Sequence, residues 1–541
     1  MTAIEDVRER MRRQDASVAG PLGRALRANG VRLAALGGPL EERWHQAVVE
    51  LAECIAPIDP GGEPVLSEGG VYLGSWIEST GTISAEILSR FAPEVAAATF
   101  RQFAAHQRDD GLIPYKITAA GPGFSQIQIV TPLARSVWNH YLVTGRDRAF
   151  LADMYAAMTR NDEWLARHRD TLGTGGVEAF CTFDTGHDLS PRFWFAPDRC
   201  LHGDATRVDP TSTAVPVVAP DLTANVAAQR EHLALIAAEL GDDPGPWRAR
   251  ADDTLRALWE QCWDEADGLF YDRDARGAHV RIASDVLLRV LACGVGDRGV
   301  FAAALERYLM NTRKFLAHYG FTSLAMDDPR FDHDFRRNSW GGPVNFLSLV
   351  RAPHAFERHG RVAELGLVSS TVLGAVVLAD RFPQCLDPWT GEAGFTQSYS
   401  PSILWLLDAV ERWFGILERP DGEVWFSGLA PTRLEHGAAP EAVAYARIVD
   451  GTGYELAADD ETVAVFRDGA PLFAFPRGWR VIADRAGVPT AIVGLAGGTV
   501  TGEFVVGDQR LELAIAPNER VELDGARIVA RETIGFVAPR A

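Results

Sequence analysis

The sequence predicts a mainly helical N-terminal part built in two layers, followed by a small antiparallel β domain of sandwich-like form. Three observations predict it. From about residue 40 to 416, apolar residues recur with helical spacing, and after about 418 the period changes to two. A chain of 541 residues with 47% hydrophobic content can also bury more than one core. We therefore expect a helical domain over 1–418, with an N-terminal helical extension, and a β domain over 419–541.

Two kinds of helix are expected in the first part. The stretch DLTANVAAQREHLALIAAELG, residues 221–241, places Leu222, Val226 and Leu233 on one stripe, as a helix wetted on one side does. The stretch VAELGLVSSTVLGAVVLAD, residues 362–380, is apolar nearly all round, as a helix buried on most sides is. This mixture predicts two concentric layers rather than a simple bundle.

The last part of the chain alternates apolar and polar residues. Segments such as ETVAVFRDG and GEFVVGDQRLELAI have the strand period, and Asp468-Gly469 and Gly507-Asp508 have the composition of hairpin turns. We expect this domain to carry no chemistry of its own, and to pack on the helical part and stabilise it.

Composition and charge restrict the partners. The net charge is -20 and the isoelectric point is about 5.1, which argues against nucleic acid and against an acidic membrane surface. A neutral substrate suits this charge best, although a local basic pocket could bind an anion. No apolar run has the length of a membrane-spanning helix, and the charged N-terminal segment lacks the apolar core of a signal peptide.

Cysteine and histidine spacing gives no sign of a metal centre. The six cysteines form no CxxC pair, and the histidines show no HExxH spacing. We therefore expect buried, reduced thiols in a cytoplasmic protein, with no disulfide, no metal site and no cofactor. The sequence is also compatible with a homo-oligomer.

Long polar loops, rich in glycine, proline and aromatic residues, separate the expected helices. Loops of such length in a compact domain are usually functional. Four motifs stand in them: DDGLIPYKI (109–117), FDTGHDLSPRF (183–193), NSWGGPVNFLSL (338–349) and QCLDPWTGEAGF (384–395).

These motifs, with the helical segment at 221–272 between the second and the third, stand in the order of a known group of enzymes. The region from roughly 70 to 410 resembles the (α/α)6-barrel glycoside hydrolases of families 63 and 37, which include processing α-glucosidases, trehalases and mannosylglycerate hydrolase. The resemblance implies that the helical part is an (α/α)6 barrel whose loops bind a small carbohydrate. The β domain lies outside the resemblance.

The resemblance places a general acid at Asp188. Inverting hydrolysis needs two carboxyl groups about 6.5–9.5 Å apart, with a water between one of them and the anomeric carbon, and one carboxyl must be protonated near neutral pH. Asp184 could raise the pKa of Asp188, whereas Arg192 would lower it unless Arg192 contacts substrate or another carboxylate. The alternative for this stretch is an Asx turn with a surface arginine.

The general-base position departs from the family pattern, because it is Gln384, an amide that cannot take a proton from water. Three explanations stay open. The chain is an inactive Glu-to-Gln form that traps a bound sugar, or a nearby carboxylate such as Asp387 or Glu392 serves instead, or the reaction needs no base, as in phosphorolysis.

Other residues of the same loops are candidates for binding sugar. The family has an aspartate directly after the residue that corresponds to Trp76; here the nearest acid is Glu78, either a sugar ligand, a displaced base or a carboxylate favoured by a helix N-terminus. The full set of expected binding residues is Trp76, Glu78, Tyr115, Asp184, Arg192, Trp340, Asn345, Asp387, Trp389 and Glu392.

We therefore predict an inverting, exo-acting glycoside hydrolase that cleaves a small, α-linked glycoside or oligosaccharide, with Asp188 as the acid and position 384 orienting the water. One alternative is a carbohydrate phosphorylase or polysaccharide lyase on the same barrel. The other is a non-catalytic sugar-binding protein in which Gln384 is natural. A small carbohydrate is the expected partner, and no nucleic acid or membrane is expected.

Overall fold

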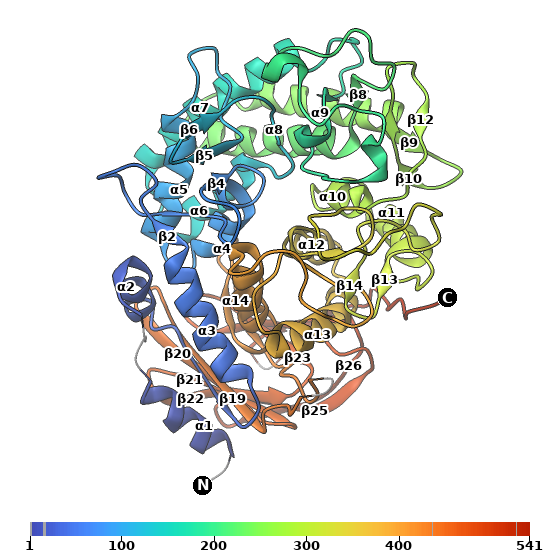
Figure 1. The fold of residues 1–541 in the computed structure, drawn as a ribbon. Coiled ribbons are helices and arrows are strands. Elements are labelled where there is room, and N and C mark those ends of the chain that lie inside the picture. The colour runs from blue at the N-terminus through green and yellow to red at the C-terminus, as the bar shows by residue number, and fades with distance from the viewer. Residues whose placement is uncertain (1–2, 15–17, 435–436, 526) are drawn as a thin grey trace.

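The computed structural model describes residues 3–14, 18–434, 437–525 and 527–541. A helical part takes up most of the chain, and two β-sheets lie against one side of it (Figure 1). Helices and strands are both abundant, so the chain is of mixed class rather than the mainly helical class that the sequence predicts. The difference arises in part because short strand pairs also lie within the helical part, such as residues 75–76 with 116–118, which the sequence does not predict.

The helical part begins with α3 and ends with α14. Its helices are α3 (Leu40–Glu53), α4 (Ala85–Leu88), α5 (Pro93–Ala105), α6 (Leu133–Val143), α7 (Arg148–His168), α8 (Pro220–Leu240), α9 (Gly245–Cys262), α10 (Val286–Leu291), α11 (Arg298–Ala304), α12 (Phe346–Arg358), α13 (Val362–Leu378) and α14 (Ser400–Phe414). A π-helical turn, η1 (Thr80–Ser84), leads directly into α4.

Every second helix of this series contacts the next member of the same set. α6 contacts α8, α8 contacts α10, α10 contacts α12, and α12 contacts α14, while α14 contacts η1 and α4, which in turn contact α6. We call α4, α6, α8, α10, α12 and α14 the inner helices. α10 and α14 are buried along their whole length, as helices covered on all sides are.

Two helices depart from the simple layer picture. α8, for which the sequence predicts a wet face, is buried on all sides from its start through Gln229, because its first turns are surrounded by loops. α13 is largely buried as predicted. A Cβ on Gly366 would approach Leu429 and Leu495, so the β domain packs against part of this helix, while Leu367 and Leu378 stay exposed. Among the described residues, no helix combines the length and the apolar character that crossing a membrane requires.

Two antiparallel sheets make up the C-terminal part. Their strands are β1 (Arg32–Leu36), β17 (Ile416–Glu418), β18 (Val424–Ser427), β19 (Ala442–Val449), β20 (Thr452–Ala458), β21 (Thr462–Arg467), β22 (Ala470–Pro476), β23 (Trp479–Ala483), β24 (Pro489–Gly494), β25 (Val500–Val506), β26 (Gln509–Ile515), β27 (Arg520–Asp524) and β28 (Arg527–Glu532). The first sheet has the order β1-β19-β20-β21-β22-β25-β26, and the second β17-β18-β23-β24-β27-β28. Phe426 of the second sheet contacts Tyr454 and Phe473 of the first, so aromatic side chains join the two.

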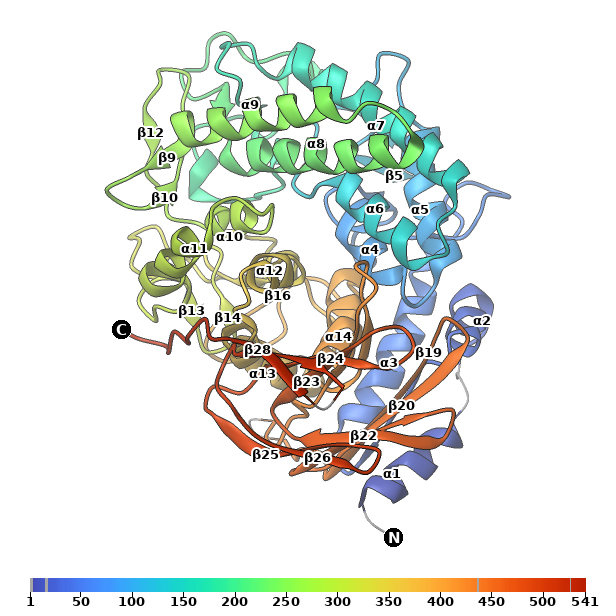
Figure 2. The same cartoon turned by 180° about the vertical axis from the view of Figure 1, so that it is seen from behind.

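The N-terminal segment supplies one strand of the first sheet, which the sequence analysis did not predict. β1 pairs with β19, with Leu33 opposite Tyr445, and α1 (Ala3–Arg12) packs on both strands (Figure 2). Val7 and Met11 of α1 are fully buried against this surface. A short strand whose partner lies far along the chain leaves no local signal in the sequence.

Candidate active site

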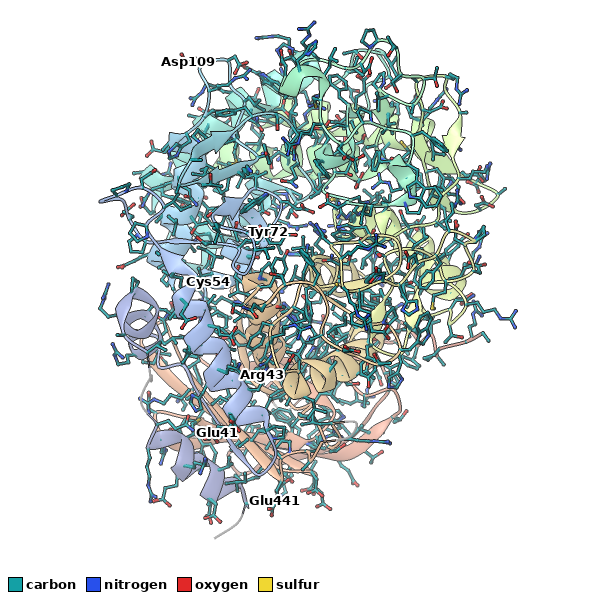
Figure 3. All side chains as sticks on the ribbon, in the orientation of Figure 1. Glu41, Arg43, Cys54, Tyr72, Asp109 and Glu441 are labelled. Atoms are coloured by element: carbon teal, nitrogen blue, oxygen red, sulfur yellow. The ribbon has the colours of Figure 1, made fainter. Side chains whose placement is uncertain are left out.

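The segments that lead into the inner helices meet at one polar cavity of about 160 Å³. They lie before η1 and α4, before α6, before α8, at the start of α12 and before α14. One lining residue, Tyr72, lies near the middle of the molecule (Figure 3). The lining residues are Glu68, Tyr72, Trp76, Glu78, Tyr115, Lys116, Gln126, Gln128, Phe183, Gly186, Asp188, Arg199, Asn338, Leu347 and Gln384.

Short strand pairs hold the walls of this cavity. β4 (Ser75–Trp76) pairs with β5 (Lys116–Thr118), and β15 (Val344–Asn345) pairs with β16 (Cys385–Leu386). The second pair places Gln384 next to the first turn of α12. Backbone hydrogen bonds therefore fix the positions of chain segments that are far apart in the sequence.

The residues singled out from the sequence divide into two groups. The cavity brings together Trp76, Glu78, Tyr115, Asp188 and Gln384. The residues that do not line it are Asp184, Arg192, Trp340, Asn345, Asp387, Trp389 and Glu392.

Asp188 is a carboxyl group that is neutral at pH 7. Burial raises its pKa to about 8, and the negative charges of Glu78 and Asp198 act in the same direction. The side-chain amide of Asn338 donates a hydrogen bond to Asp188 Oδ2, and the backbone N–H of Trp340 donates to the Asp188 carbonyl at 2.9 Å. A neutral, oriented carboxyl is what a proton donor requires.

Glu78 is a buried carboxylate beside two guanidinium groups. Its Oε1 lies 3.6 Å from Arg289 Nη2 and 3.7 Å from Arg351 Nη2. Burial raises the pKa of Glu78, and the two arginines oppose that rise. A Cβ on Gly186, whose φ is 66°, would overlap Glu78 Oε2, so the loop that carries Asp188 passes directly over this carboxylate.

Gln384, Tyr72 and Glu68 also line the cavity, and Tyr72 and Glu68 were not predicted from the sequence. The Tyr72 hydroxyl donates to Gln384 Oε1 at 2.9 Å, and burial raises the pKa of that hydroxyl. The Tyr399 hydroxyl donates to Glu68 Oε1 at 2.8 Å, and burial raises the pKa of Glu68 to about 8. Glu68 and Tyr72 lie a few residues before Trp76, and nearness to that residue was the available signal.

Two basic residues also line the cavity. The Lys116 amino group lies 5.5 Å from the ring centre of Tyr115 and 5.6 Å from that of Trp76. Arg199 comes from an exposed stretch at the other end of the loop that carries Asp188. They give this wall a positive character that the overall charge of the chain conceals, and no spacing pattern in the sequence indicates it.

Asp184 and Arg192 lie in buried ion pairs behind the cavity. Asp184 Oδ2 accepts a hydrogen bond from Arg169 Nη1 at 2.6 Å, so its charge is neutralised there. The guanidinium of Arg192 bridges Asp221 at 2.9 Å and Asp272 at 2.7 Å. Both residues thus brace the loop around Asp188 from behind.

Trp340 and Asn345 are buried supports. The ring centre of Trp340 lies 4.6 Å from that of His187, and the guanidinium carbon of Arg289 lies 4.6 Å from the same Trp340 ring centre. Asn345 caps α12, because its Oδ1 accepts a hydrogen bond from the backbone N–H of Leu347 at 2.9 Å.

The three candidates near position 384 lie outside the lining of the cavity. Asp387 accepts hydrogen bonds from the backbone N–H groups of Trp389 and Thr390 and pairs with His333, which stabilises the turn. Trp389 is 47% exposed, and Glu392 lines a separate surface hollow.

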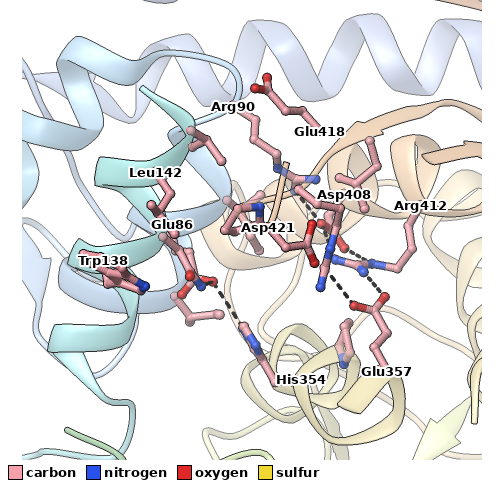
Figure 4. Close-up of a pocket in the computed structure, with 18 of the residues that line it drawn as sticks. Glu86, Arg90, Trp138, Leu142, His354, Glu357, Asp408, Arg412, Glu418 and Asp421 are labelled. Carbon is pink, nitrogen blue, oxygen red and sulfur yellow. Dashed lines mark hydrogen bonds and ion pairs between the residues drawn. The ribbon is translucent and has the colours of Figure 1, made fainter. Parts of the chain in front are cut away.

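A larger cavity, of about 340 Å³, lies toward the other ends of the inner helices (Figure 4). Three of its buried carboxylates have a basic partner in the same lining: Asp408 pairs with Arg412, Glu357 with Arg419, and Glu86 with His354. Because Asp188 of the smaller cavity has no such basic partner among the described residues, the smaller cavity is the candidate active site.

Comparisons with known proteins agree on the helical part of the chain. The family model described as "Mannosylglycerate hydrolase MGH1-like glycoside hydrolase domain" matches residues 72–402. A mannosylglycerate hydrolase of Rubrobacter radiotolerans is 27% identical over 184 residues, which is 34% of this chain and 41% of that protein. The matched stretch therefore spans less than half the length of that relative.

Solved structures extend the likeness in fold. The crystal structure of a GH63 mannosylglycerate hydrolase from Thermus thermophilus, in complex with Tris and D-glycerate, gives a TM-score of 0.56 at 20% identity, over 68% of this chain and 99% of that chain. A sialidase structure gives a TM-score of 0.61 at 15% identity, over 89% of this chain and 44% of that chain. At these identities the likeness concerns the fold.

Proposed function

Because the chain belongs to the mannosylglycerate hydrolase MGH1-like family of glycoside hydrolase domains, we propose that it is an inverting, exo-acting glycoside hydrolase. The observation that carries the proposal is the neutral carboxyl of Asp188 on a small polar cavity. A cavity of this size suits about one sugar unit, in keeping with release of a terminal residue. Asp188 gives its proton to the glycosidic oxygen as the bond breaks.

We assign the general base to Glu78. Gln384 cannot accept a proton from water, and Asp387 and Glu392 lie outside the cavity. Glu68, with a pKa of about 8, is protonated at neutral pH. Burial raises the pKa of Glu78 as well, but two guanidinium groups oppose that rise, and we therefore assign to Glu78 the proton of the attacking water. Gln384, held by Tyr72, orients that water or a sugar hydroxyl.

The same proposal extends to the architecture. We expect the inner helices to close into an (α/α)6 barrel, with the helical domain over 1–418 and the β domain over 419–541, except that α1, β1 and β17 join the sheets of the β domain. The succession of contacts from α4 through α14 and back to α4 supports closure. The fold likeness to the Thermus enzyme structures supports it as well.

The substrate that fits this cavity best has a sugar joined to a small acid. Lys116 and Arg199 bring two positive charges to a cavity in an otherwise acidic protein. A relative named mannosylglycerate hydrolase, and a structure of another with bound D-glycerate, make α-mannosylglycerate the first substrate to test. The two cations would bind its carboxylate.

A panel assay tests the proposal. The full chain is incubated with α-mannosylglycerate and with neutral α-glycosides, and proton NMR follows the anomer released. We expect release of the inverted anomer, and faster turnover of the acidic substrate. Retention of configuration would contradict the inverting mechanism, and absence of turnover on every glycoside would contradict hydrolysis.

Gln384 favours one second candidate, a sugar-binding protein without turnover. The variant Gln384→Glu separates the two. If Glu78 is the base, wild type turns over and the variant gains little. If wild type binds mannosylglycerate in calorimetry but neither protein hydrolyses it, the binding function is correct.

A further inference from the structure

Two cysteines lie side by side behind the loop that carries Asp188. Cys181 Sγ and Cys200 Sγ are 3.5 Å apart, and both side chains are buried. The chain ends of the loop are already joined, because the backbone N–H of Thr182 donates to the Pro197 carbonyl at 2.9 Å.

We propose that Cys181 and Cys200 form a reversible disulfide bond that fixes the loop over 181–200, with a peroxide as the oxidant. The inference does not depend on the proposed hydrolase activity, because it concerns a covalent modification of the loop itself.

The geometry needs little rearrangement. A disulfide bond is about 2.0 Å long, so the two sulfur atoms have to approach by roughly 1.5 Å. The backbone hydrogen bond between Thr182 and Pro197 shows that the two ends of the loop already lie side by side. Rotation of the two side chains within their shared cluster with Phe180 can supply most of the movement.

The surroundings assign the two thiols different roles. Cys200 Sγ lies 3.7 Å from Arg169 Nη2 and 3.7 Å from Asp184 Oδ2, at the end of the loop. Cys200 also follows the exposed Arg199, whereas Cys181 is fully buried and burial raises the pKa of its thiol. Cys200 is therefore the first thiol to react, and Cys181 the one that resolves the intermediate.

The reaction balances in two steps. The Cys200 thiolate attacks one peroxide oxygen, which breaks the O–O bond and gives a sulfenic acid and hydroxide. The Cys181 sulfur then attacks the Cys200 sulfur, forms the S–S bond and releases the sulfenic oxygen as water. In total, two thiols and one hydrogen peroxide give one disulfide and two waters, and a dithiol reductant reverses the change.

A metal ion is the competing occupant, because one atom each of Cys181, Asp184 and Cys200 lie within 4.8 Å of one another. The Asp184 carboxylate already pairs with Arg169 at 2.6 Å and accepts from the backbone N–H of Ile127 at 2.9 Å. A cation thus already occupies the position that a metal would need, and the thiol pair is left to form a bond with itself.

The crosslink bears on the cavity because the enclosed loop supplies four of its lining residues. They are Phe183, Gly186, Asp188 and Arg199. A covalent tie at the base of the loop restricts the motion of this wall in both the folded and the unfolded chain.

Peroxide treatment of the full chain tests the proposal. The folded protein is exposed to hydrogen peroxide at neutral pH and alkylated in urea before and after dithiothreitol. We expect two of the six thiols to be lost and then regained. The peptide map should join Cys181 to Cys200, and the Tm should rise by about 3 °C.

Three variants serve as controls. Cys181→Ser and Cys200→Ser should both lose the crosslink and the rise in Tm. Cys262→Ser, which removes a buried thiol that contacts the Val218 carbonyl, should keep both. Six free thiols after peroxide, a map that joins other cysteines, or one zinc ion per chain that protects both thiols would each overturn the proposal. If a serine variant does not fold, the peptide map of wild type decides alone.

Discussion

The two cavities of the helical part are built on the same inner helices and differ in how their carboxylates are paired. In the larger cavity burial acts against ionisation, but Arg412 and Arg90 hold the pKa of Asp408 below its usual value. In the smaller one, burial raises the pKa of Asp188 to about 8, and no cationic side chain of the described residues pairs with it. The comparison indicates that an unpaired carboxyl group such as Asp188, rather than cavity volume, marks the place of a proton donor.

The largest effect should come from the acid itself. Asp188→Asn removes the transferable proton while keeping the shape and the hydrogen bond from Asn338. We expect kcat to fall by roughly 10²- to 10⁴-fold. The Tm should not fall, because an uncharged amide is at no disadvantage in this site. Retained turnover in a steady-state assay would remove Asp188 from the acid role.

A substitution in the larger cavity should reduce stability rather than activity. Asp408→Asn removes one carboxylate partner from two buried guanidinium groups, those of Arg90 and Arg412, which keep Glu411 and Glu357 as second partners. We expect roughly 1.5–3 kcal/mol less stability in urea unfolding, with kcat of the folded fraction unchanged. Because the folded pKa of Asp408 is depressed, its stabilising contribution is present above the unfolded pKa and is lost as pH falls.

Substitutions at two glycines test how closely the loop that carries Asp188 approaches Glu78. Gly186 and Gly173 both have φ of 66°, but a Cβ would overlap the Glu78 carboxylate only at Gly186, and at Gly173 it meets open space. Both alanine variants should lose about 1–2 kcal/mol of stability from backbone strain. Only Gly186→Ala should also lower kcat/KM. Equal activity in the two variants would show that the position of Glu78 does not matter.

The smallest effect concerns pH. The neutral form of Asp188 predominates below its pKa of about 8, so the alkaline limb of kcat/KM should lie near pH 8. Asp198→Asn removes one negative charge that raises this pKa, and should move the limb downward by less than about one pH unit. An unchanged limb would show that Asp188 is not the group that titrates there.

The order of the motifs was the feature of the sequence that predicted most of the candidate site. The stretches around Trp76, Asp188 and Gln384 were singled out from residue types and order, and all three lie on one cavity. Partners set by long-range contacts could not be foreseen. Arg169, which neutralises Asp184, and the pair Asp221 and Asp272, which holds Arg192, come from other segments.

Long-range contacts limited the prediction of the fold as well. The change of period near residue 418 predicted the sheets, because alternation is local. β1 was not predicted because its partner, β19, lies far along the chain. The apolar sequence of α13 correctly indicated burial, but only the three-dimensional arrangement shows that the covering layer is the β domain.

The strand β1 has a consequence for how the protein is made. It leaves the ribosome long before its partner β19 exists, so its edge stays open while the whole helical part is synthesised. The first sheet can be completed only when the strands after α14 emerge and β19 pairs with β1. A chain stalled before β19 keeps an unpaired strand that is exposed to aggregation.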